Sequence, residues 1–108
     1  MKVSVDFSVY TQADGAFGSV SGEIDTLIPP QLGDSISFLF SQGDQTIEPS
    51  IGFSGILKVT DRVIAANRGD QHLMLALSDI TLATKNDAIK VTEYLEAAFN
   101  LFVVIYAE

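Results

Sequence analysis

Hydrophobic and polar residues alternate strictly at the start of the chain. The apolar positions are Val3, Val5, Phe7 and Val9. A period of two in β-branched and aromatic residues predicts a β-strand with one buried face. Asp14 and Gly15 favour a tight turn, and a second strand is expected over residues 16–28. Two glycines in that strand, Gly18 and Gly22, predict a bulge or the close approach of a neighbouring backbone.

Three more strands are expected further along the chain, over residues 35–41, 51–65 and 71–82. In the 51–65 strand, Asp61 and Arg62 break the alternation, which predicts a bulge or a kink. The 71–82 strand is fairly apolar on both faces, a pattern typical of a central strand or of one that a helix covers. Its two faces carry Leu73, Leu75 and Leu77 on one side and His72, Met74 and Ala76 on the other.

A helical pattern follows these strands. Apolar residues recur there at spacings of three and four, which predicts an amphipathic helix with one stripe packed on the sheet. Thr84, three residues before Asp87, is typical of a helix start, and Asn100 is expected to end the helix because it tolerates left-handed geometry. Residues 101–106 then predict a short final strand, the alternative being a helix that runs on to the C-terminus.

These elements predict one α+β domain over residues 1–108. We expect five mostly antiparallel strands in a meander, one C-terminal α-helix packed on the sheet and a short final strand. The glycines and the bulge at residues 61–62 favour a strongly twisted or partly barrel-like sheet.

The composition narrows the class of function. Fourteen acidic and six basic residues give a net charge of −8, which disfavours binding to nucleic acids and to anionic membranes. The first 57 residues hold seven of the acids and one base. The chain has no cysteine, so disulfides are excluded and a cytoplasmic location is expected. An apolar fraction of 47% exceeds what one small core hides, which predicts an exposed apolar sheet face and self-association.

No catalytic, cofactor-binding or metal-binding motif is apparent, so we expect no cofactor. Four residues are candidates for binding: Asp61 and Arg62 at the predicted bulge, and His72 and Met74 on the second face of the 71–82 strand. His72 is the single histidine, so any acid–base role that needs an imidazole falls on it.

Three hypotheses for function remain open. The first is a small acidic, non-enzymatic protein-binding or assembly module that acts through an exposed apolar sheet face, as a homodimer or with a protein partner. The second is a carrier of a small ligand in a cavity between helix and sheet, lined by Phe38, Phe40, Phe53 and Phe99. The third is a small enzyme that uses His72 with Asp61 or Asp79.

Overall fold

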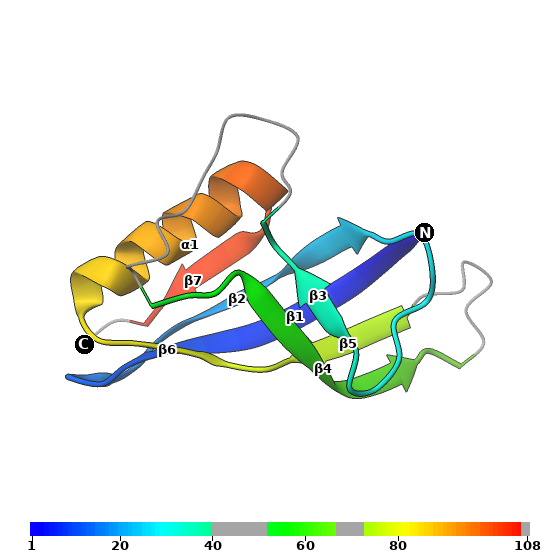
Figure 1. Ribbon diagram of the computed structural model, residues 1–108, viewed down its shortest axis with the longest axis horizontal. Helices are drawn as coiled ribbons and strands as arrows, with labels where there is room; N and C mark the ends of the chain where they lie inside the picture. The colour runs from blue at the N-terminus through cyan, green and yellow to red at the C-terminus, as the bar shows by residue number, and fades with distance from the viewer. Residues whose placement is uncertain (40–51, 67–72, 107–108) are drawn as a thin grey trace.

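The computed structural model describes residues 1–39, 52–66 and 73–106, which form seven strands and one helix (Figure 1). In chain order these are β1 (Lys2–Thr11), β2 (Gly15–Asp25), β3 (Ser35–Ser37), β4 (Ile56–Ile64), β5 (Leu73–Leu77), β6 (Ile80–Leu82), α1 (Lys85–Phe99) and β7 (Phe102–Ile105). The strands form one mixed sheet in the order β3-β4-β5-β1-β2-β7, with β6 paired to β1 beside this path. The sheet is not closed, and the predicted α+β class is confirmed.

The sheet differs from the predicted meander in its connectivity. β5 and β6 both pair parallel to β1, with Val5 opposite Leu75 and Val9 opposite Ile80. The single strand expected over residues 71–82 is therefore two strands, separated by Ser78 and Asp79. Parallel neighbours require a long connection, and here residues 12–72, which include β2, β3 and β4, lie between β1 and β5.

Several strands are also shorter than expected. β2 ends at Asp25, ahead of the two prolines at 29 and 30, and Ile28 is 70% exposed. β3 ends at Ser37 and β4 begins at Ile56, while residues 40–51 lie outside the described part of the chain. The expected bulge is confirmed, because the register between β4 and β5 shifts between Val59 and Asp61.

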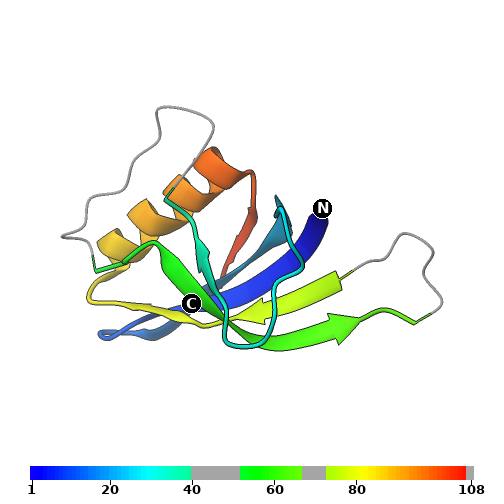
Figure 2. The same cartoon turned by 45° about the vertical axis from the view of Figure 1, so that its right-hand side comes forward.

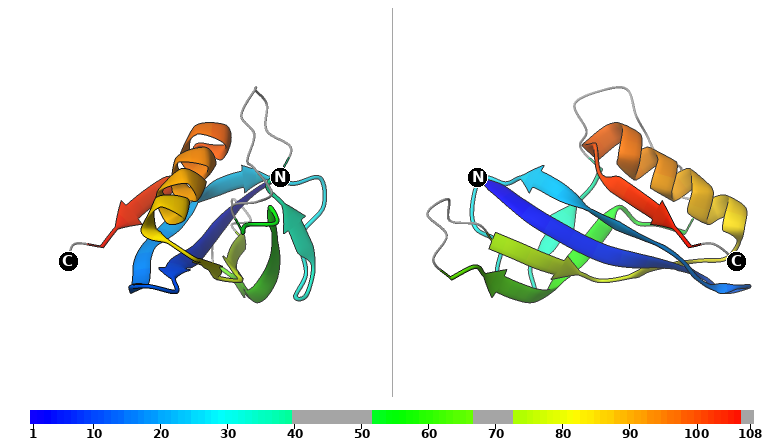
Figure 3. Two further views of the ribbon diagram at one scale, coloured as in Figure 1. Left: turned by 60° about the vertical axis from the view of Figure 1, so that its left-hand side comes forward. Right: turned by 180° about the vertical axis from the view of Figure 1, so that it is seen from behind.

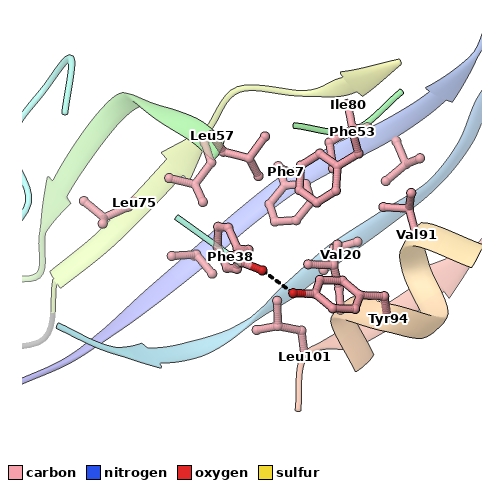
Figure 4. Close-up of a cluster of buried hydrophobic side chains, with 14 of the residues drawn as sticks. Phe7, Val20, Phe38, Phe53, Leu57, Leu75, Ile80, Val91, Tyr94 and Leu101 are labelled. Carbon is pink, nitrogen blue, oxygen red and sulfur yellow. Dashed lines mark hydrogen bonds between the residues drawn. The ribbon is translucent and has the colours of Figure 1, made fainter. Parts of the chain in front are cut away.

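The core lies on one face of the sheet, under α1, which contacts β1, β2, β6 and β7 (Figures 1 and 2). The alternation in the sequence explains the position of this core. The four apolar residues of β1 that alternate, Val3, Val5, Phe7 and Val9, are at most 5% exposed. From α1, Ala88, Val91, Tyr94 and Leu95 are buried against them. Figure 4 shows how Phe7, Val20 and Leu75 from three strands gather with Phe38 in this layer.

The helix begins and ends where its sequence predicts. The Thr84 Oγ1 accepts a hydrogen bond from the Asp87 N–H (3.2 Å), so Thr84 is the N-cap. Asn100 is the C-cap, with a left-handed φ of 56°, and its N–H donates to the Glu96 carbonyl (3.1 Å). No helix in residues 1–39, 52–66 and 73–106 is long and apolar enough to cross a membrane.

The chain reverses at Asn100 and returns as β7, so the predicted final strand is confirmed and the helical alternative is wrong. β7 pairs antiparallel with β2, and Gly18 lies opposite Ile105. A Cβ atom at position 18 would collide with the carbonyl oxygen of Val104. Gly18 thus permits the close approach of β7, as its position in the strand suggested.

Candidate functional site

The two faces of the sheet differ in their cover. We call the side under α1, which carries Val5 and Leu75, the covered face. The opposite side, which carries Asp6 and Ala76, is the open face, and no described helix packs on it. Figure 3 shows the arrangement from two further directions, with α1 on the inner side of the curved sheet.

Two cross-strand rows of side chains run over the open face. The first row consists of Glu23 on β2, Ser4 on β1, Met74 on β5 and Val63 on β4. The second row consists of Ser21, Asp6, Ala76 and Asp61 on the same four strands. Carboxylates, small polar groups and apolar side chains are therefore interspersed on this face of the sheet.

These rows line a hollow of about 510 Å³. A second hollow of about 490 Å³ shares Asp6, Ser21 and Ala76 with the first and continues along β1 and β2 to Thr60 and Asp79. We call the two together the open-face hollow. Four carboxylates line it, from Asp6, Glu23, Asp61 and Asp79, and none of the described residues that line it is cationic.

Two of the four residues predicted for binding meet in the open-face hollow. Asp61 lies there because the bulge after Val59 places it opposite Ala76. Met74, 38% exposed, lies one row away, opposite Val63 on β4. The strand that carries Met74 thus has one buried face and one exposed face.

Arg62 and Asp61 are adjacent in sequence, but the structure separates their roles. Arg62 lies opposite Leu75, on the covered side of β4, and its Nε donates a hydrogen bond to the carbonyl oxygen of Pro30 (2.9 Å). This bond ties the β2–β3 connection to β4. The Asp61 Oδ1 accepts from the N–H of Arg62 (2.9 Å), which stabilises the bulge.

His72, the fourth candidate, lies outside the described residues. Its proposed acidic partners, Asp61 and Asp79, both line the open-face hollow. Asp79 has a structural bond, since its Oδ1 accepts from the N–H of Ser8 (2.9 Å) on β1. Next to it, the Ser78 Oγ accepts from the N–H of Lys58 (3.0 Å) on β4. The break between β5 and β6 therefore satisfies backbone groups of both neighbouring strands.

Most of the residues that line the open-face hollow were not identified from the sequence. Ser4, Asp6, Ser8, Ser19 and Ser21 are the polar positions of the first hairpin, and their alternation alone marks them as an outward face. The alternation does not show that β5 pairs with the other edge of β1, because the two strands are more than 60 residues apart in the chain. The combined site needs that parallel pairing.

A separate hollow of about 370 Å³ lies where the end of α1 meets β2 and β3, and Phe38 and Phe99 line it. These are two of the four rings expected around a cavity between helix and sheet, and they meet edge to face at 5.2 Å. Phe53 is buried in the core, and Phe40 lies outside the described residues. In the same hollow, the Thr26 Oγ1 is buried with no hydrogen-bond partner among the described residues.

Beside this hollow, the Tyr94 hydroxyl donates a hydrogen bond to the carbonyl oxygen of Phe38 (Figure 4). The bond joins α1 to the segment after β3. Burial raises the pKa of the Tyr94 hydroxyl above its usual value of 10.0, because the charged phenolate loses its hydration inside the protein. Tyr94 is therefore a structural link rather than an accessible acid.

The four carboxylates of the open-face hollow come from different parts of the sheet. Across the described residues, no group of three or more His, Cys, Asp and Glu side chains could hold a metal ion. Strands are about 4.8 Å apart, so Asp6 on β1 and Asp61 on β4 are about 10 Å apart across β5. Comparison with protein-family models, with curated proteins and with solved structures finds no match to this chain.

Proposed function

We propose that the protein is a non-enzymatic protein-binding module and that it binds its partner on the open face of the sheet. The observation that carries the proposal is the open-face hollow, in which exposed apolar side chains of Val63 and Met74 lie beside the carboxylates of Asp6, Glu23 and Asp61. Apolar contacts supply affinity in such a surface, and the charges select the partner.

The chemistry of the hollow favours a cationic, extended segment of the partner. Along one face of a strand, side chains repeat about every 7 Å. Diagonal neighbours on paired strands are about 7–8 Å apart, which is the relation between Asp6 and Glu23. A segment with lysine or arginine at alternate positions therefore presents its charges at the spacing of these carboxylates. The aliphatic stems of these lysine or arginine side chains can contact Met74 and Val63 on the same face.

A titration with two model peptides tests this proposal. One peptide alternates lysine and valine, the other alternates glutamate and valine, and binding is followed by the amide NMR shifts of the protein. We expect the lysine peptide to bind, with the shifts concentrated in β1, β2 and β5. Binding of the glutamate peptide with equal affinity would contradict the proposed selectivity.

Matched variants separate the open-face hollow from the overall acidity. Asp6→Asn together with Asp61→Asn keeps the shape of both side chains and removes two charges. Each exposed ion pair contributes about 0.2–1 kcal/mol, so the loss of two pairs should lower the affinity about two- to thirtyfold. The control Glu93→Gln together with Glu96→Gln also removes two exposed charges, both from α1 on the other side of the sheet. An equal loss in the control would mean that the peptide responds to net charge alone.

A carrier of small ligands is the second candidate, supported by the unpaired Thr26 Oγ1 beside Phe38 and Phe99. A ligand with a hydrogen-bonding group and an apolar body would complement this hollow. Thermal unfolding in the presence of medium-chain alcohols and fatty acids tests it, since a ligand that binds the folded state raises the melting temperature. Stabilisation that persists unchanged in Thr26→Val and Phe99→Ala would contradict this site.

A further inference from the structure

β7 forms one end of the sheet, and no described strand pairs with its outer edge (Figure 3). Its side chains are apolar and exposed: Phe102 is 73%, Val104 57% and Ile105 55% exposed, and Tyr106 beyond the strand is 46% exposed. Monomeric proteins usually protect such an edge with lysine, proline, a bulge or a very short strand. β3, at the other end of the sheet, has three residues; β7 has four, and it carries no lysine, no proline and no bulge.

The hydrogen bonds to β2 fix which backbone groups of β7 point outward. The Tyr106 N–H donates to the carbonyl of Phe17 (2.9 Å), and the Val104 carbonyl lies against Gly18. In an antiparallel ladder, the N–H and C=O of one residue point to the same side, and the side alternates from residue to residue. Phe102, Val104 and Tyr106 therefore bond toward β2. Val103 and Ile105 present their N–H and C=O groups at the free edge.

We propose that this free edge pairs with the β7 strand of a second copy of the chain, antiparallel and about a twofold axis at Val104. In this register Val103 lies opposite Ile105 of the second copy, and the reverse, so both outward-pointing residues of each strand form their hydrogen bonds. Val104 lies opposite its own symmetry mate in the position where side chains are closest. The two sheets join into one continuous sheet.

The side chains favour the same register. Phe102 and Val104 are on the open face, opposite Ser21 and Ser19 of β2, and Tyr106 follows them by alternation. Pairing about Val104 places Phe102 opposite Tyr106 of the second copy, twice, on either side of the central valines. Aromatic cross-strand pairs are among the more stabilising contacts in a sheet. A strand that is complementary to itself in both backbone and side chains fits a second copy of this chain.

The area of the contact sets its strength. The four exposed apolar side chains present on the order of 400 Å² per chain, since a large aromatic side chain offers about 150–250 Å². The two copies would then bury about 800 Å² of side-chain surface together with the paired backbones, below the range of about 1,200–2,000 Å² typical of tight complexes. A contact below this range fits a weak, reversible dimer. It uses residues that do not line the open-face hollow, so it stands independently of the proposed function.

Sedimentation over a range of protein concentrations measures the association directly. The intact chain should pass from monomer to dimer with rising concentration, and Val104→Lys should raise the dissociation constant at least tenfold, because it places two like charges opposite each other. Val104→Asp should do the same, and mixing the two variants should restore a dimer through the Lys–Asp pair. As a control, Ile64→Lys on β4, where the residue is 67% exposed, should leave the association unchanged. A concentration-independent monomer, or a mixture that stays monomeric, would overturn the proposal.

Cross-linking tests the register without adding charge. The chain has no cysteine, so Val104→Cys introduces a single thiol. Cα atoms in the close antiparallel pair are about 4.5 Å apart, within the range for a disulfide. Val104→Cys should therefore form a covalent dimer on mild oxidation. Phe102→Cys, on the same face and more exposed, should not, because its symmetry mate lies four residues away along the strand, about 13 Å. Equal cross-linking of both variants would exclude the twofold axis at Val104.

Discussion

Single hydrogen bonds at two residues connect parts of the chain that are distant in sequence. Arg62 reaches from β4 to the carbonyl of Pro30, and Tyr94 reaches from α1 to the carbonyl of Phe38. Both acceptors belong to connections around β3, a strand of three residues with little pairing of its own. These two side chains therefore help to hold the segments on both sides of β3 in place.

Tyr94→Phe should destabilise the protein by about 1–2 kcal/mol near neutral pH, because the carbonyl of Phe38 loses its buried donor. The loss should shrink at high pH. Burial raises the pKa of Tyr94 in the folded state above 10.0, so the unfolded chain ionises first as the pH rises. The stability that neutral Tyr94 contributes is complete below pH 10 and is lost above it. Urea unfolding of both proteins near pH 8 and near pH 11 measures this, and an equal difference at both values would contradict it.

The sequence predicted that the strand is interrupted at Asp61, but it did not predict the direction in which the Asp61 side chain points. The sequence shows that the alternation fails at residues 61 and 62. Which of the two charges points to the open face depends on where the extra residue lies, and the bulge between Val59 and Asp61 decides it through the pairing with β5. Local pattern therefore identified the position, and tertiary pairing assigned Asp61 to the hollow and Arg62 to the covered side.

Among the elements, α1 and β1 were predicted well because their signals are local. The Thr84 cap, the apolar stripe and Asn100 act within a few residues of one another. The parallel pairing of β5 with β1 has no such local signal. It depends on a connection of 61 residues, 12–72, and on Ser78 and Asp79, whose side chains replace ladder bonds at the break. In the sequence, serine and aspartate at these positions are equally consistent with an ordinary solvent-exposed strand face.

The turn from α1 into β7 depends on the left-handed conformation of Asn100, which positions both the helix end and the strand proposed to self-associate. Asn100→Ala should lower the free energy of unfolding by about 1 kcal/mol, because a Cβ without a compensating polar group is unfavourable there. Asn100→Gly should be neutral or slightly stabilising at the same position. Denaturant unfolding of the two variants provides the comparison, and an alanine variant as stable as the glycine variant would contradict the role of the αL conformation.

For the whole molecule, two proposed surfaces lie on one strongly acidic body. Four of the acids that give the overall charge of −8 line the open-face hollow, whereas the β7 edge carries no charge between Phe102 and Tyr106. Attraction for a cationic segment and repulsion between two copies therefore come from the same excess of acids. Screening by salt should therefore weaken the binding of the cationic segment and strengthen the association of two copies.

Raising the salt concentration from about 0.1 M to about 1 M shortens the screening length from about 10 Å to about 3 Å. The dimer should become several-fold tighter, because the two copies no longer repel each other while the apolar contacts at β7 remain. Binding of the lysine–valine peptide should weaken over the same range, since its attraction to Asp6, Glu23 and Asp61 is screened. Sedimentation and peptide titration on the same samples measure both constants. Opposite slopes require two distinct surfaces of different chemistry, whereas two constants that move together would mean that self-association and peptide binding depend on one and the same contact.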